Sequence, residues 1–240
     1  MAVISHFLMV ALASSQAPMG PHVEEGRASA SRSAICDPGV EMLPNGGGVV
    51  VRRCGSTGTV AGVGSNIDAA TVNANGLLAV AEQGFVCGVS ARDPYVTRPA
   101  PGVGIKADCS GRSISAYGMT TTTAGQNLLE LAINLAESQA ACDVDYYTGS
   151  AHGYRYSYEC SRPGANWKVA GIGSSVDDSN AIAMRLVKRS SETGGYCTFD
   201  NAELNGVVFS ANLQCNGTTY MGYGSTVTAA AADAAAQADA

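Results

Sequence analysis

The stretch Val169-Ala170-Gly171-Ile172-Gly173-Ser174 recurs in altered form three more times along the chain. Its counterparts occupy residues 60–65, 116–120 and 220–225. Each version is a short extended run followed by a glycine turn, and each precedes a stretch with the alanine content or apolar spacing of a helix. Self-similarity at a spacing of about 50 residues indicates a repeat architecture.

Eight cysteines follow the same period in two series, Cys36, Cys87, Cys142, Cys197 and Cys54, Cys109, Cys160, Cys215. Pairing within each unit would give Cys36–Cys54, Cys87–Cys109, Cys142–Cys160 and Cys197–Cys215. The alternative would give Cys54–Cys87, Cys109–Cys142 and Cys160–Cys197, and would leave Cys36 to pair with Cys215. Sequence alone leaves the connectivity open. The repeat favours the first scheme because it places one bond across the hairpin of every unit.

Two strand-like stretches precede each glycine run, as in the alternation of Val103, Ile105, Ala107 and Cys109. We therefore predict an α+β fold of four tandem, disulfide-stapled ββ-β-α repeats, each an antiparallel three-stranded sheet plus one helix. The units would span residues 36–86, 87–141, 142–196 and 197–240. Helices are expected over residues 67–83, 123–139, 176–191 and 227–240, with N-caps at Ser65, Thr120, Ser174 or Ser175, and Ser225.

The N-terminal segment and the cysteines predict the compartment. Residues 1–17 combine a short apolar stretch with small residues and are expected to be a signal peptide, although a buried strand or helix would also fit. Residues 18–35 would form an N-terminal arm. Eight cysteines at regular spacing are typical of an extracellular or cell-surface protein. No stretch reaches the roughly 20 apolar residues of a transmembrane helix, so no membrane span is expected.

The charge balance of the chain indicates whether nucleic acid is a partner. The chain of 240 residues has 14 Lys and Arg against 20 Asp and Glu, a formal net charge of -6, and no basic run. Neutralising phosphates requires clustered lysine and arginine, so nucleic acid is not an expected partner.

Candidate groups for chemistry are few. His152 is the one histidine outside the N-terminal segment, which disfavours nucleophilic catalysis. The cysteines lack the close spacing or the histidine partners of a zinc site, so neither a metal nor a cofactor is expected. Asp143 and Asp145 would share a strand face and could act as an acid–base pair, although a solvated face is the simpler interpretation.

The third unit is rich in aromatic residues. Tyr154, Tyr156 and Tyr158 alternate along one strand, and with Trp167 they could form a platform that stacks on sugars. In the second and fourth units the face shared with the cysteine is aliphatic, which favours burial of these rings in the core over a platform. Asn216-Gly217-Thr218 is the chain's one N-x-S/T sequon, and it predicts an exposed glycosylation site at Asn216.

The ββ-β-α order, with Gly-x-Gly-Ser before an alanine-rich helix, is similar to the second half of the double-stranded RNA-binding domain. Residues 169–174 and the helix after them match best. RNA contacts in that family depend on lysines at the start of the helix. The corresponding positions here are Asn66, Ile67 and Asp68 in the first unit and Ser175, Val176 and Asp177 in the third. The resemblance covers about half of each unit and implies a topology without RNA binding.

These patterns lead to an expected function. We expect a secreted, non-enzymatic structural repeat protein, a subunit of an extracellular fibre, surface layer or matrix. The alternative is a secreted module that binds carbohydrate or another ligand, and an enzyme using Asp143 or Asp145 ranks last. The strand near Cys36 follows no repeat helix and the last helix precedes no strand. The two ends are therefore complementary, and head-to-tail self-association is expected.

Overall fold

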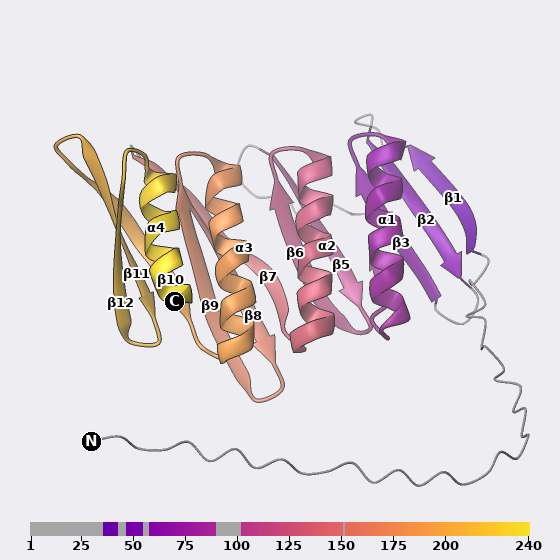
Figure 1. The fold of residues 1–240 in the computed structure, drawn as a ribbon. Helices are drawn as coiled ribbons and strands as arrows, with labels where there is room; N and C mark the ends of the chain where they lie inside the picture. The colour runs from indigo at the N-terminus through magenta and orange to yellow at the C-terminus, as the bar shows by residue number, and fades with distance from the viewer. Residues whose placement is uncertain (1–35, 43–46, 55–57, 90–101, 151) are drawn as a thin grey trace, which may run out of the picture. The chain divides into compact units, whose positions relative to one another are not determined.

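The structure is a computed structural model, and it describes residues 36–42, 47–54, 58–89, 102–150 and 152–240 (Figure 1). The predicted signal peptide, residues 1–17, and the predicted arm, residues 18–35, lie outside the described residues.

Three strands and then a helix follow one another four times along the described chain. The first segment contains β1 (Cys36–Met42), β2 (Gly48–Cys54), β3 (Gly58–Gly64) and α1 (Ile67–Glu82). The second contains β4 (Cys87–Val89), β5 (Val103–Cys109), β6 (Arg112–Gly118) and α2 (Thr121–Ser138). The third contains β7 (Ala141–Ser150), β8 (Gly153–Arg162), β9 (Ala165–Gly173) and α3 (Val176–Thr193). The fourth contains β10 (Cys197–Asn205), β11 (Val208–Cys215), β12 (Thr218–Gly224) and α4 (Val227–Asp239).

The predicted α+β class is confirmed, but the sheets differ from the prediction. The first two segments form separate antiparallel sheets of order β1-β2-β3 and β4-β5-β6. The last two segments share one six-stranded sheet of order β12-β11-β10-β9-β8-β7. Within it β9 and β10 pair in parallel, so this sheet is mixed. One three-stranded antiparallel sheet per segment is therefore wrong for this half of the chain.

The second and third junctions differ at one residue position in the last strand before the helix. Ala170 in β9 pairs directly with Thr198 in β10. The corresponding residue of β6 is Ser115, and its hydroxyl accepts a hydrogen bond of 2.9 Å from the N–H of Val144 in β7. The side chain thus takes a main-chain donor that a ladder would use, and β6 and β7 lie side by side without pairing.

The helices begin where capping side chains accept the first free N–H groups. Thr120 and Ser175 cap α2 and α3, as predicted. The caps of α1 and α4 are wrong by one residue, because Asn66 and Thr226 accept the N–H groups three residues ahead in place of Ser65 and Ser225. Asn and Thr cap helices about as well as Ser, so residue type does not separate adjacent positions.

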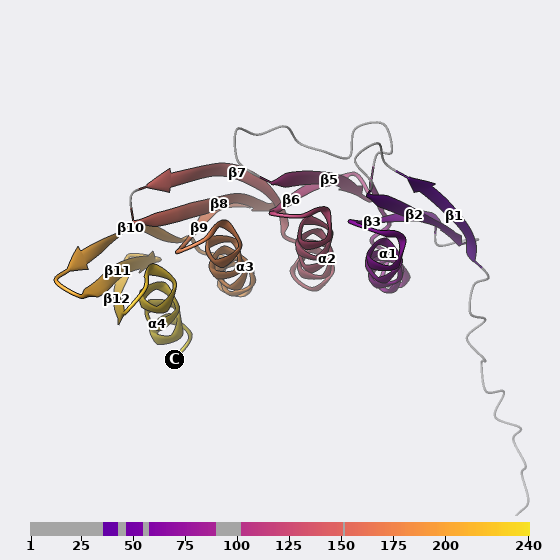
Figure 2. The same ribbon diagram turned by 90° about the horizontal axis from the view of Figure 1, so that it is seen from above.

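The four helices lie on one face of the strands (Figure 2). Their apolar stripes are buried there, including Leu128, Leu131 and Leu135 of α2 and Leu186 of α3. No helix in the described ranges is long and apolar enough to cross a membrane.

The recurring glycines are strand residues and not the turn that the sequence suggested. Gly171 and Gly173 lie in β9 and face α3. A Cβ at Gly171 would lie 2.5 Å from the Ser179 carbonyl oxygen and closer still to the Ala183 nitrogen. Gly62 and Gly222 meet α1 and α4 in the same way. The glycines therefore let each helix backbone lie directly on the last strand of its segment.

Candidate functional site

The disulfides join directly opposed residues of the first two strands of a segment. The bonds Cys87–Cys109, Cys142–Cys160 and Cys197–Cys215 have the within-unit pairing expected from the spacing. Cys36 and Cys54 are opposed in the same way in the register of β1 and β2. Their side chains lie outside the described residues. A bond across a hairpin fixes its register, so the segments present their edges in a defined geometry.

One polar contact recurs at each junction, the boundary between two consecutive segments. The first junction pairs Ser65 with Thr122 reciprocally: Ser65 N donates to Thr122 Oγ1 at 3.0 Å, and Thr122 N donates to Ser65 Oγ at 3.2 Å. Ser174 and Thr228 form the same pair at the third junction, at 2.9 and 3.4 Å. At the second junction Met119 N donates to Asp177 Oδ1 at 3.2 Å.

These contacts use the same two positions each time. The donor precedes an N-cap by one residue, and its partner follows the next helix's N-cap by two residues. Aligning the four helices on their N-caps brings out the polar side chains that form this contact, a signal that the strand and cysteine periodicity alone does not give. The four residues at the second helix position are Asp68, Thr122, Asp177 and Thr228.

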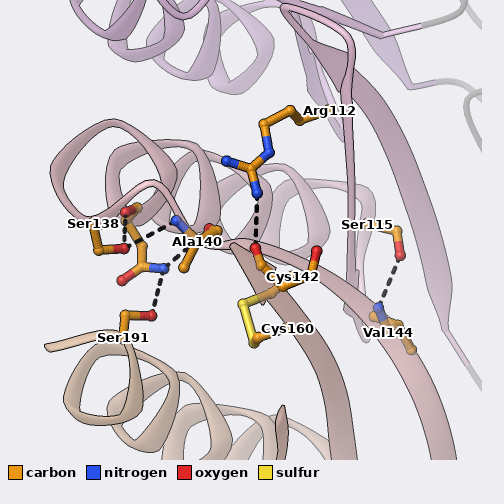
Figure 3. Close-up of a disulfide and its surroundings, with 10 residues drawn as sticks. Arg112, Ser115, Ser138, Ala140, Cys142, Val144, Cys160 and Ser191 are labelled. Atoms are coloured by element: carbon orange, nitrogen blue, oxygen red, sulfur yellow. Dashed lines mark hydrogen bonds between the residues drawn. A yellow bond between two sulfur atoms is a disulfide. The ribbon is translucent and has the colours of Figure 1, made fainter. Parts of the chain in front are cut away.

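Additional bonds fasten the second junction, which surrounds the Cys142–Cys160 disulfide (Figure 3). Arg112 of β6 donates to the carbonyl oxygens of Gln139 and Ser161, at 2.6 and 2.8 Å. Asn134 of α2 donates to the Ser191 hydroxyl of α3 at 3.1 Å, where both side chains are buried. One arginine and one buried amide thus connect the strand layer and the helix layer of two segments.

At the third junction, ion pairs connect α3 with α4. Arg185 Nε donates to Asp239 Oδ2 at 2.8 Å, and Arg189 pairs with Asp239 Oδ1 at 3.0 Å. On the strand side Arg155 Nε donates to the Phe199 carbonyl oxygen at 2.8 Å. Two cations on α3 thus hold the last turn of α4.

The tyrosines considered for a sugar platform face the core, the interpretation that the sequence favours. Tyr156 and Tyr158 are fully buried, Trp167 is nearly so, and Tyr154 is half-buried. Tyr158 Oη donates to Asn180 Oδ1 at 2.5 Å, and burial, followed by the charge of Glu130, raises its pKa. Stacking on a sugar needs an open ring face, which Tyr156 and Tyr158 lack, so the core alternative describes them.

The two aspartates of the third segment have different bonding partners. Asp143 accepts a hydrogen bond from the Ser113 hydroxyl at 3.4 Å. Asp145 lies at a bulge in β7 and pairs with Lys168 Nζ at 3.3 Å. Glu159 pairs with the same ammonium at 2.7 Å. The hydrogen bonds to Glu159 and Asp145 raise the pKa of Lys168. The bulge breaks the strand alternation on which the predicted pairing of Asp143 with Asp145 relied.

A groove of about 500 Å³ runs between α2 and α3. Its rims carry opposite charges, with Glu130 and Glu137 on α2 and Arg185 and Lys188 on α3. Partial burial raises the pKa of Glu130. The buried side chain of Met184 also lines the groove. The groove therefore offers charged edges beside an apolar wall.

The predicted glycosylation site lies in a two-residue hairpin turn. Asn216 is exposed and has a left-handed backbone with φ of 51°, followed by Gly217 at 83°. This pair is typical of a type I′ turn between β11 and β12. His152 is exposed as well, and its ring lies 6.4 Å from the ring of Phe209.

Within the described ranges, no three His, Cys, Asp or Glu side chains gather to hold a metal ion. Comparison of the chain with protein-family models and with curated proteins gives no match.

Proposed function

We propose that the chain is a secreted, non-enzymatic structural protein, one link of an extracellular fibre, surface layer or matrix. In this proposal the four segments are tandem repeat units, with boundaries at residues 36–86, 87–141, 142–196 and 197–240. The links would associate head to tail with other copies of the chain.

The recurring junction carries the proposal. Three successive junctions use the same pair of positions, Ser65–Thr122, Met119–Asp177 and Ser174–Thr228. A contact that repeats at a fixed spacing is the way in which repeat proteins bury surface against their neighbours. The three disulfides support an oxidising, extracellular location, where such bonds persist.

The observed contacts favour structure over the other two functions considered. Asp143 and Asp145 bond to Ser113 and Lys168, which are contacts typical of a solvated strand face. Carbohydrate binding through Tyr156 and Tyr158 would require opening of the core.

Electron microscopy of the oxidised full chain at increasing concentration tests the proposal. Filaments or sheets with a regular axial spacing are expected. A glycan array run on the same material tests the alternative. Isolated particles at every concentration, together with specific glycan binding, would replace the structural role with a binding role.

A further inference from the structure

Segment 4 exposes two strand residues at positions that the other segments bury. Three residues before the N-cap, Val63, Tyr117 and Ile172 are 1, 3 and 3% exposed, whereas Tyr223 is 56% exposed. Five residues before the cap, the corresponding residues are Ala61, Ser115, Ala170 and Met221. The first three are buried, and Met221 is 44% exposed.

The burial of Tyr117 comes from the segment that follows it in the chain. The ring of Tyr117 in β6 lies 5.6 Å from the ring of Tyr156 in β8, so it packs across the second junction. Tyr223 has the same place in its own segment, on β12 at the edge of the six-stranded sheet. A tyrosine and a methionine exposed side by side are residues that protein interfaces favour.

A helix side chain bonds the backbone of the last strand in the first, second and fourth segments, although with different polarity. Asn73 donates to the Val63 carbonyl oxygen at 2.7 Å, and Asn127 donates to that of Tyr117 at 2.6 Å. Each amide lies seven residues after its N-cap, and at both junctions the neighbouring strands do not pair through a ladder.

In α4 the residue at that seventh position is Asp233, which accepts the Tyr223 N–H at 3.1 Å. Gln237 donates to the Met221 carbonyl oxygen at 2.9 Å. Side chains of α4 thus bond one N–H and one carbonyl group of β12, and a neighbour would also meet the side chains of Met221 and Tyr223.

The hydrogen-bonding positions of the junction are also present at both ends. Ser225 precedes an N-cap, and Asp68 follows one by two residues. Met119 N–H already bonds an aspartate at that second helix position, Asp177. Both Ser225 and Asp68 are exposed, and Val40 on the edge strand β1 is 56% exposed.

We propose that Met221, Tyr223 and Ser225, the outer strand surface, bind the first segment of a second copy of the chain. Tyr223 and Met221 pack beside β1, where Val40 is exposed, and the Ser225 N–H donates to the Asp68 carboxylate. The second copy is the occupant because its first segment carries the matching half of a contact that the chain forms three times within itself. This inference rests on the proposed function and names the surface through which the links would associate.

The first test compares two charge substitutions in the full chain. Tyr223→Asp should raise the dissociation constant for self-association about tenfold or more, because a buried aromatic anchor is replaced by a charge. Ile133→Asp is the control, since Ile133 is exposed to a similar degree on α2, away from both ends. It should leave association unchanged. Sedimentation velocity gives the constants, and circular dichroism shows that both variants remain folded.

The second test is a charge exchange across the contact. Ser225→Asp should weaken association by placing a carboxylate against Asp68, and adding Asp68→Lys in the same chain should restore it. A photoreactive phenylalanine analogue at position 223 should cross-link to a peptide from residues 36–82 of another copy.

The outcomes separate this inference from the proposed function. Association that withstands both Tyr223→Asp and Ser225→Asp, or cross-links only to residues 218–240 of the other copy, overturns the surface and leaves the structural role. A wild-type chain that never associates overturns both, and would make Asp233 and Gln237 the polar cap of a monomer.

Discussion

Gly171 determines how closely α3 can approach β9, because its α-carbon faces the backbone of the helix. Strand residues next to helices usually pack through side chains, whereas here two backbones are in direct contact. Gly62 and Gly222 have the same role in their segments. The repeated glycines therefore encode an interlayer distance.

Gly171→Ala should lower the free energy of unfolding by about 3 kcal/mol, the upper range for overpacking, since the obstacle is backbone that cannot rotate away. Gly88→Ala is the matched control, because a Cβ there meets nothing within 4 Å. Urea denaturation of both variants measures the difference. Equal stability of the two variants would contradict the close approach of α3.

Substitutions of Asn216 test how its left-handed backbone affects the stability of the hairpin turn in the fourth segment. Its φ of 51° is accessible to asparagine and glycine but strained for alanine. Asn216→Ala should therefore be less stable than Asn216→Gly by about 1 kcal/mol. Both variants lose the sequon and the side chain, so thermal unfolding of the pair isolates the backbone effect. A glycine variant no more stable than the alanine variant would show that φ does not decide this turn.

For single residues, the sequence predicts the chemical role of a side chain better than the face on which it lies. It identified capping residues to within one position, because Asn66 and Ser65 are both good caps. It allows either a surface or a core position for Tyr156 and Tyr158, because strand alternation shows which residues share a face but not whether other elements cover that face. The glycines predict a turn as readily as a close approach of two backbones, because glycine is common in both settings.

At the scale of elements, the disulfides and the strand pairing stabilise each hairpin together. Cys142–Cys160 and Cys197–Cys215 both close loops with a sequence separation of 18. They join opposed strand residues in the same sheet. Their contributions to stability should therefore be similar.

Replacing Cys142 and Cys160 together with alanine should lower the free energy of unfolding by about 3 kcal/mol, from the loop entropy regained by the unfolded chain. The matching double variant of Cys197 and Cys215 should lose nearly the same amount. Urea denaturation under oxidising conditions measures both. A loss in only one hairpin would show that packing around the bond, and not loop closure, decides its effect.

The sequence predicted the order of elements but not the joining of the sheets. Period and cysteine spacing locate strands and helices because both depend on local composition. Whether adjacent segments pair depends on how their edge strands meet in three dimensions. Ala61 and Ala170 have corresponding positions, yet only β9, the strand of Ala170, pairs with the next segment. The third and fourth segments therefore merged into one mixed sheet that no local pattern predicted.

At the scale of the whole molecule, consecutive segments are joined by contacts that use corresponding residues. The first and fourth segments carry the two halves of this contact in Asp68 and Ser225, with Tyr223 and Met221 exposed beside Ser225. A heterologous contact of this kind does not saturate at a dimer unless the rotation closes a ring. This is the physical basis for expecting an extended assembly.

Sedimentation velocity of the oxidised full chain over a wide concentration range shows whether copies of the chain associate head to tail. We expect a weight-average sedimentation coefficient that rises continuously with concentration, without a plateau at the dimer. A single monomer species with an unchanged coefficient at every concentration would contradict it.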